Sequence, residues 1–432
     1  MAIGLSNHEV YPRVVRCGCP QTVSIVPVGT VAKFNDEWVY NIGIVPTECS
    51  DQTYIEQERA VDTIKVKPVD GVITFTYTFD EEQEWALLLA PEIYPTSIRK
   101  YSVYSLMDDL YERTPYKGDL HAHSNSSDGN EEPCIVAANY RKNGFDFFAL
   151  TDHHKFQPSV DLIEYYKDLP IDFKIFTGEE IHLKGYYIHT VNFGGKSSVN
   201  EHYNSDPDAM HEEIKKMSET LSVPAGINKL EFAYRKWIAD EIHKRDGFAI
   251  IAHPFWIWKD EWHMRPRMVD YLLGEELYDA MEIVSGVSPH ETNLQTAFYN
   301  EQRAKGRKIA IVGSSDCHGT DPALFFNNSK SIVFAKDLEY SSICSAIKDL
   351  YSVAVETRPN EGVRIYGPFR LVKYARFLMS NYFPMHDEMC FEEGRLMKEY
   401  IRGDKDAVKL LEIMQGRTKK LADKLLKQGD NK

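Results

Sequence analysis

The sequence predicts an α/β protein of three segments, with a barrel of alternating strands and helices in the middle. Up to residue 116 the chain consists of short β-like runs separated by turn residues, which indicates a small all-β domain. From residue 117 to residue 357 apolar runs alternate with helical stretches, the pattern of repeated βαβ units. Residues 358–432 are charged and carry apolar residues at helical spacing, which predicts a helical C-terminal extension.

The first segment is expected to be a β-sandwich without chemistry of its own. Its predicted strands cover residues 22–28, 37–44, 62–66, 71–79 and 84–89. No group of polar residues suited to catalysis accompanies them, so we expect an accessory or oligomerising domain. Any homo-oligomer is expected to form through this domain or through the C-terminal helices.

The middle segment contains short apolar runs that are predicted to be strands. These runs end at Leu120, Leu150, Thr177, Val191, Ala252, Val284 and Val312. Apolar periodicity predicts helices over residues 133–143, 160–167, 208–221, 231–245 and 288–305. Residues 340–355 are predicted to add a helix and a strand. This alternation favours a largely parallel sheet or barrel.

Composition excludes several classes of function. The 432 residues contain no apolar run approaching the roughly 20 residues of a membrane span, and the first ten residues do not resemble a secretory signal. Seven scattered cysteines fit reduced thiols, so we expect a cytoplasmic protein. The net charge of −15 argues against wrapping a long duplex. A small substrate, or a short end of a larger one, fits better.

Histidines and acidic residues recur where the predicted strands end. They are His121, His123, Asp152, His153, His154, Glu179, Glu180, His189, His253, Asp316 and His318. In a parallel barrel the functional groups lie at the rim where strands end and loops begin. A single buried histidine is usually a core residue, but this repetition at one rim predicts a multinuclear metal site.

The spacing within two of these groups adds to the argument. His121 and His123 are two residues apart, as are Asp316 and His318, and residues i and i+2 of an extended chain point the same way. Each pair can therefore hold one ion. Asp128 precedes a turn and is about equally well explained as an ordinary turn aspartate. Imidazoles and carboxylates without thiolates suit zinc, manganese or iron.

These motifs resemble those of the PHP (polymerase and histidinol phosphatase) superfamily. The stretch Gly118-Asp119-Leu120-His121-Ala122-His123-Ser124, with Ser127-Asp128-Gly129, resembles its first motif. The later motifs of its stand-alone metal-dependent phosphoesterase branch resemble Thr151-Asp152-His153, Gly178-Glu179-Glu180-Ile181, Tyr187-Ile188-His189, Ala252-His253-Pro254 and Ser315-Asp316-Cys317-His318. The resemblance covers roughly residues 116–357.

The resemblance implies a distorted (β/α)7 barrel with two or three divalent ions at its rim, in the full case a trinuclear metal centre. The implied ligands are His121, His123, Glu180 and Asp316 for one ion, Glu180, His189 and His253 for a second, and Asp128, His153 and His318 for a third. Glu180 would bridge two ions, with Glu179 as the competing residue. A metal-bridging hydroxide would attack phosphorus, so no catalytic side chain is implied beyond the metal ligands.

We therefore expect a hydrolase, a metal-dependent phosphoesterase acting on a phosphate monoester, a nucleotide or a short oligonucleotide end. The candidate substrate contacts are His154, Lys155, Trp256 and Arg265, with Lys184 and Arg267 as further phosphate-binding cations. Two alternatives stay open. The metals could hydrolyse a non-phosphate bond such as an amide, or the protein could be a non-catalytic scaffold with a structural metal cluster.

Overall fold

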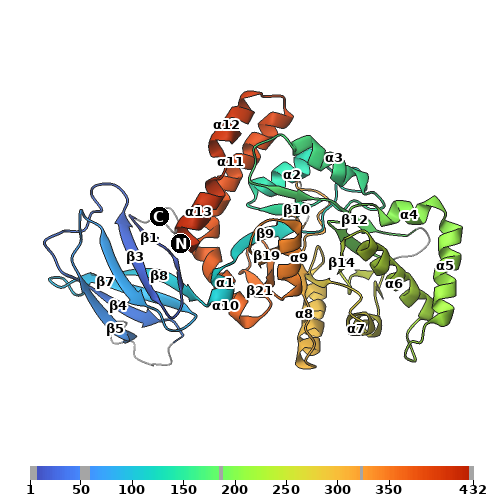
Figure 1. Ribbon diagram of the computed structural model, residues 1–432, viewed down its shortest axis with the longest axis horizontal. Coiled ribbons are helices and arrows are strands. Elements are labelled where there is room, and N and C mark those ends of the chain that lie inside the picture. Colours follow the sequence, from blue (N-terminus) through green and yellow to red (C-terminus); the bar gives the residue numbers. More distant parts are fainter. Residues whose placement is uncertain (1–6, 49–58, 184–187, 322–324, 428–432) are drawn as a thin grey trace. The chain divides into compact units, whose positions relative to one another are not determined.

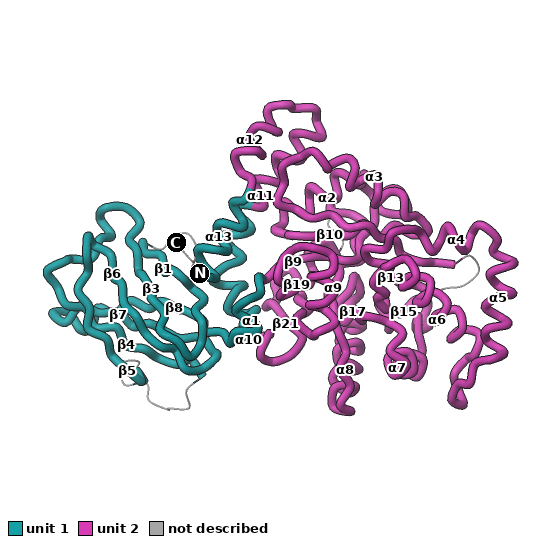
Figure 2. Tube along the Cα trace, in the orientation of Figure 1, with its two compact units in different colours: residues 1–114, 373–389, 416–432 teal, residues 115–372, 390–415 magenta. Residues whose placement is uncertain are grey.

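The computed structural model describes residues 7–48, 59–183, 188–321 and 325–427. The chain forms two compact units (Figure 2). Unit 1 consists of Met1–Thr114, Lys373–Met389 and Gly416–Lys432, and unit 2 of Pro115–Val372 and Cys390–Gln415. The C-terminal helical segment is thus divided between the units. The domain boundaries expected after residues 116 and 357 stay predictions.

Unit 1 contains two β-sheets that share one core (Figure 1). The three-stranded sheet has the order β1-β3-β6 and the five-stranded sheet the order β2-β8-β7-β4-β5. Side chains of both sheets, including Ile25, Ile42 and Leu87, are buried together. The strands are β1 (His8–Tyr11), β2 (Val14–Arg16), β3 (Pro20–Pro27), β4 (Tyr40–Pro46), β5 (Asp62–Val66), β6 (Ile73–Thr78), β7 (Glu84–Pro91) and β8 (Arg99–Leu106).

The C-terminal helices supply part of unit 1. Tyr104 of β8 lies against Tyr374 and Phe377, with ring centroids 5.2 and 5.3 Å away, and the backbone N–H of Arg13 donates to the carbonyl of Leu425 at 2.8 Å. The helices concerned are α1 (Asp108–Tyr111), α10 (Phe369–Asn381), α11 (Phe383–Ile401) and α13 (Arg417–Leu426), of which α10 and α11 continue into unit 2.

Unit 2 is built on a six-stranded and a five-stranded sheet, each with mixed strand directions. The six-stranded sheet has the order β11-β10-β9-β19-β20-β21 and the five-stranded sheet the order β12-β13-β14-β17-β18. The strands of the first are β9 (Thr114–Asp119), β10 (Phe147–Ala149), β11 (Lys174–Phe176), β19 (Ser329–Ala335), β20 (Ser352–Glu356) and β21 (Arg364–Tyr366). Those of the second are β12 (Gly178–Ile181), β13 (Thr190–Phe193), β14 (Phe248–Ile251), β17 (Ala280–Val284) and β18 (Ile311–Gly313).

Helices of unit 2 begin and end close to where apolar periodicity predicts them. Side chains cap several of them: Asn228 accepts hydrogen bonds from the first turn of α6, and Ser288 forms a capping box with Glu291 in α8. Two helices, α4 and α7, are not predicted. The bounds are α2 (Pro133–Lys142), α3 (Gln157–Tyr166), α4 (Val199–Ser205), α5 (Pro207–Thr220), α6 (Lys229–Lys244), α7 (Pro266–Gly274), α8 (Pro289–Ala304), α9 (Tyr340–Lys348) and α12 (Asp406–Met414).

The strand ladders themselves do not close into the single barrel expected from the motifs, because they form these two sheets. The strand predicted to end at Thr177 is β11 of the first sheet, and a further strand that is not predicted, β12, follows it in the second sheet. The sheets meet beyond their ladders through two parallel bridges, Ala122 with Cys317 and His153 with Glu180. These bridges bring the ends of β9, β10, β12 and β18 together.

The sequence predicts no membrane-spanning segment and reduced cysteines. In the described part of the chain no helix is long and apolar enough to cross a membrane. The cysteines that the structure describes form no disulfide.

Candidate metal centre

The ends of these strands bring together all nine residues that the motifs suggest as metal ligands. His121 and His123 follow β9, His153 follows β10, Glu180 lies in β12, and His189 directly precedes β13. His253 follows β14, Asp316 and His318 follow β18, and Asp128 comes from the loop after His123. Ligand atoms lie within 4.8 Å of one another in three groups: His121, His123, Glu180 and Asp316; His153, Glu180 and His189; and His123, Asp128, His153 and His318.

Glu180 lies at the middle of the cluster and is completely buried. Its carboxylate is 3.1 Å from His121 Nε2, 2.7 Å from His189 Nδ1 and 3.4 Å from His253 Nε2. Neither carboxylate oxygen accepts a hydrogen bond from the described residues, an arrangement that is costly without a cation. Burial alone would raise the pKa of Glu180, but His121 and the other imidazoles hold it well below its ordinary value.

His121, His123 and Asp316 point at one common place. The two Nε2 atoms are 3.2 Å apart, and Asp316 Oδ1 is 3.3 and 3.0 Å from them. Burial lowers the pKa of His123, but Asp316 and Glu180 raise it more, to about 9. The carboxylates thus attract positive charge to this place, and its three nitrogen and oxygen donors are of the kind that zinc, manganese and iron bind.

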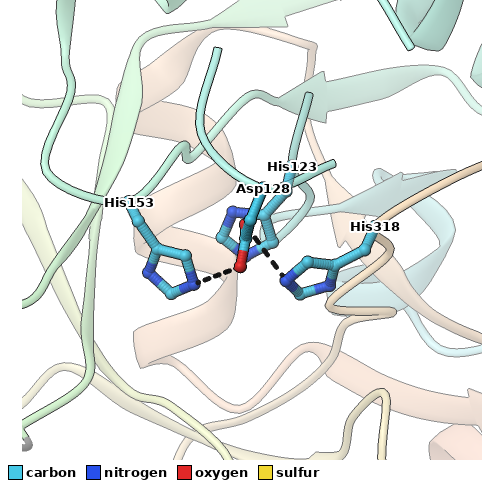
Figure 3. Close-up of side chains that lie close together, drawn as sticks. All are labelled: His123, Asp128, His153 and His318. Carbon is cyan, nitrogen blue, oxygen red and sulfur yellow. Dashed lines mark ion pairs between the residues drawn. The ribbon is translucent and has the colours of Figure 1, made fainter. Parts of the chain in front are cut away.

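A third group is more exposed. Asp128 lies between His153 and His318 (Figure 3), with its carboxylate oxygens 3.7 Å from His153 Nε2 and 3.3 Å from His318 Nε2. The ring of His123 is 4.5 and 4.4 Å from those two rings. Burial raises the pKa of Asp128, but His318 and His153 together depress it far more.

Further hydrogen bonds orient the ligands, and the sequence motifs do not reveal them. His121 Nδ1 is 2.9 Å from Glu282 of β17, and His318 Nδ1 is 2.9 Å from the carbonyl of Asp316. In both residues Nδ1 is occupied by this bond, and Nε2 faces the cluster. Metal-bound histidines commonly have such a partner on the nitrogen that does not bind the metal. Glu282 also accepts the backbone N–H of His253 at 2.9 Å. In the sequence, Glu282 is marked only by being an acidic residue within an apolar run.

Neighbouring acidic residues have structural roles. Asp152 accepts the N–H and hydroxyl of Ser124 at 2.8 and 2.7 Å and the hydroxyl of Ser127 at 2.6 Å, which shapes the loop that carries Asp128. Asp119 accepts the backbone N–H of Ser315 at 3.1 Å, which joins the β9 end to the loop that carries Asp316.

The two adjacent glutamates face different surroundings. Glu179 accepts hydrogen bonds from the side chains of Asn192, Ser198 and Asn200 and from the N–H of Val199, at 2.6 to 3.0 Å. These donors satisfy its carboxylate and tie β12 to β13 and α4. Successive residues of a strand point to opposite sides, so Glu180 faces the histidines. This geometry favours Glu180 over Glu179 as the bridging ligand.

Two ligands have unusual backbone angles. His253 and Asp316 have φ values of 22° and 49°, in the left-handed region that β-carbon sterics disfavour. Strain of this kind persists where surrounding structure holds it, and it concentrates at functional sites. At Asp316 the backbone N–H donates to the carbonyl of His121 at 2.9 Å. The segment Ser315-Asp316 also packs against Gly286, where a β-carbon would collide with the carbonyl of Ser315.

A pocket of about 570 Å³ opens over the cluster. Three of the expected substrate contacts, His154, Lys155 and Trp256, line it. Arg265 instead precedes α7 as an exposed residue and is not among the described residues of the lining. Lys184 lies outside the described residues. The motifs do not single out His182, which lines the pocket and stacks on His154 at 4.9 Å.

No family model and no curated protein matches the chain, but solved structures do. One is a two-domain protein from Bacteroides vulgatus described as containing a PHP-like metal-dependent phosphoesterase, at 18% identity and TM-score 0.39, covering 59% of this chain and 75% of that one. Another is a Bifidobacterium adolescentis protein described as a metal-dependent phosphoesterase, at 15% identity and TM-score 0.34, covering 47% and 87%.

A third similar structure is an amidohydrolase from Chromobacterium violaceum with bound sulfate, at 16% identity and TM-score 0.33, covering 48% of this chain and 89% of that one. The first description names the superfamily that the motifs resemble, and the second names a metal-dependent phosphoesterase only. TM-scores below 0.5 do not establish the details of a shared fold. The case for a metal centre therefore rests on the side chains described above.

Proposed function

We propose that this protein is a metal-dependent phosphoesterase that holds two or three divalent ions on the cluster around Glu180. The observation that carries the proposal is the buried carboxylate of Glu180, surrounded by imidazole nitrogens and without a hydrogen-bond donor of its own among the described residues. His121, His123, Asp316, His189 and His253 would share two ions with it. Asp128, His153 and His318 would hold a third, with manganese, zinc or iron as the candidate metals.

The scaffold we propose is a distorted seven-stranded barrel. If the bridges His153–Glu180 and Ala122–Cys317 are counted with the ladders, strand contacts run in the order β9-β10-β12-β13-β14-β17-β18 and return to β9. Both bridges lie beside proposed ligands. Backbone bonds across them, such as the N–H of Glu180 to the carbonyl of Thr151 at 3.0 Å, would hold the ligands in place.

Charge favours a phosphate ester over an amide. Three divalent ions would bring six positive charges, against four negative charges from Asp128, Glu180, Glu282 and Asp316. The difference, six minus four, leaves about +2 at the pocket floor if the imidazoles are neutral. Lys155 on the pocket wall adds another positive charge. A cationic pocket in a chain of net charge −15 selects for an anionic substrate.

In this proposal the protein's side chains bind the substrate and orient the metal ligands, and the ions supply the chemistry. Bound ions of this kind activate water and polarise phosphoryl oxygens, so no nucleophilic side chain is needed. His154 and His182 line the pocket, where their rings stack on each other, and a neutral imidazole can donate a hydrogen bond to a phosphate oxygen. Glu282 keeps His121 oriented, and the Asp152 network holds the Asp128 loop over the floor.

The test combines elemental analysis of untagged protein with turnover of phosphate monoesters and amides. Wild type is expected to carry two or three metal equivalents and to hydrolyse phosphate esters. His253→Ala is expected to lose metal and at least about 100-fold in turnover, since even an outer partner of a metal ligand can cost 10–100-fold. His290→Ala, at an exposed position of α8, is the matched control and should behave as wild type.

The alternatives have distinct outcomes. Turnover of amides but not of phosphate esters would support a non-phosphate hydrolase. A full metal complement without turnover of either class would support a scaffold with a structural cluster. Metal-free protein that stays inactive after addition of manganese or zinc would contradict the proposal.

A further inference from the structure

A hairpin rich in tryptophan lies beside the metal centre. Its strands, β15 (Ile257–Trp258) and β16 (Glu261–Trp262), pair antiparallel. Trp256 directly precedes β15 and lines the pocket. Its ring centroid is 5.8 Å from that of His189 and 5.5 Å from that of His253. The hairpin therefore begins at the proposed metal ligands.

The hairpin is rigidly built at both ends. Lys259 and Asp260 form its two-residue turn with φ values of 50° and 65°, the sign pattern of the type I′ turn that matches the twist of paired strands. At the open end the N–H of His263 donates to the carbonyl of Trp256 at 2.8 Å. A preorganised surface loses little entropy when it binds a ligand.

The tryptophans make a continuous aromatic surface that leads out of the pocket. The rings of Trp256 and Trp258 are 5.7 Å apart at an interplanar angle of 37°, and Trp258 is 53% exposed. Large apolar side chains exposed at the edge of a binding pocket commonly mark a contact surface for a ligand. Trp262 is also exposed, at 43%. Among the described residues neither Trp258 nor Trp262 lines the pocket itself, but Trp258 contacts the pocket residue Trp256, whereas Trp262 contacts Phe255.

We propose that Trp256 and Trp258 form a stacking platform that selects phosphate esters whose alcohol is a nucleoside. This inference rests on the proposed phosphoesterase function and names its substrate class. With the phosphate on the metal cluster, the sugar occupies the pocket and the base lies on the indole of Trp258. Trp258 is then a specificity-determining residue that touches the substrate but not the reacting atoms.

The physical basis is base–aromatic stacking. A base stacked on an aromatic side chain contributes on the order of tenfold or more to affinity, and the contact tolerates any base because each has a π face. Lys259 lies over the ring of Trp258, with Nζ 5.8 Å from the ring centroid. That positive charge suits a ligand with a further phosphate, such as an oligonucleotide end.

The test compares adenosine 5′-monophosphate with ribose 5-phosphate, which share the phosphate ester and the sugar but differ in the base. The metal-loaded wild type is expected to show a kcat/KM at least tenfold higher for the nucleotide. Trp258→Ala should lower kcat/KM for the nucleotide by about tenfold and leave ribose 5-phosphate unchanged. Trp258→Phe should retain most of the preference, and Trp262→Ala, the matched control on the same hairpin, should retain all of it.

Calorimetric titration with adenosine separates this inference from the function on which it rests. If adenosine binds, binds more weakly to Trp258→Ala, and no phosphate ester is hydrolysed, the platform is supported while the phosphoesterase proposal fails. If both esters are hydrolysed alike and Trp258→Ala changes neither, the platform is overturned. An equal loss for both esters would also overturn it, because the residue would then support the sugar or the fold and not the base.

Discussion

The two units use their interiors differently. In the sandwich of unit 1 the buried side chains are mainly aliphatic and aromatic, with Ile25, Ile42 and Leu87 fully buried. In unit 2 the side chains that are equally buried include carboxylates and imidazoles, and Glu180 and His121 are 0% exposed. Apolar burial stabilises a fold directly, whereas buried charge costs free energy unless it is compensated. The buried charged groups of unit 2 therefore need compensation by partners or by bound ions, which the apolar core of unit 1 does not.

The largest expected effect comes from removing the central charge of unit 2. Glu180→Gln keeps the size of the side chain but removes the negative charge that two ions would share. We expect metal content to fall by at least one equivalent and turnover to fall by about 1000-fold or more, a loss of roughly 4 kcal/mol of transition-state stabilisation. Elemental analysis and kinetics measure both, and retained metal with full activity would refute the bridging role.

A core substitution in unit 1 tests whether its apolar interior contributes to stability only. Leu87→Ala leaves a cavity between the two sheets and should lower the free energy of unfolding by about 2–5 kcal/mol. Metal content per folded protein should not change, because the metal cluster draws no ligand from unit 1. Denaturant unfolding and elemental analysis check this, and a parallel loss of metal would show that the two units are coupled.

A smaller effect is expected one step away from the ligands. Glu282→Gln keeps a hydrogen-bond acceptor for His121 but removes the charge that strengthens the bond. Partners of this kind usually contribute 10–100-fold to metal affinity or activity, so we expect a loss in that range with the fold intact. Competition with a chelator gives the affinity. An unchanged affinity would mean that His121 needs no charged partner.

The smallest effect concerns an ion pair of unit 2 outside the site. Asp279 is 2.9 Å from His243 Nε2 and accepts the N–H of Ala249 at 2.7 Å. Burial raises its pKa, but these partners and Lys348 lower it more, to below the ordinary 3.8. A depressed pKa stabilises the fold above pH 3.8, and this contribution is lost as the pH falls through the folded-state value.

Asp279→Asn should therefore lower the free energy of unfolding by about 1–3 kcal/mol at pH 7. The difference from wild type should shrink when unfolding is measured at pH values below about 4. An equal difference at both pH values would show that the carboxylate charge contributes nothing, and that the loss comes from packing.

Much of the fold follows from local pattern. Apolar periodicity predicts α2, α6 and α8 within a few residues, because this signal acts within a few turns of a helix. Apolar periodicity does not predict some other elements. β8 begins with the charged pair Arg99-Lys100, and β19 begins with the polar residues Ser329-Lys330-Ser331, yet all seven residues of β19 are buried. Burial of this kind depends on what packs above and below the strand.

The sequence by itself determined which residue types follow the strands, because His121 and His123 come shortly after β9, and Asp316 and His318 come shortly after β18. The ends of such strands meet at one edge of the fold. Only the tertiary structure shows that Glu179 and Glu180 have different surroundings, since the donors that satisfy Glu179 come from β13 and α4. It also brought Glu282 to His121, and Trp258 to Trp256, which lines the pocket. These choices depend on contacts between residues distant in the chain, which local propensities do not encode.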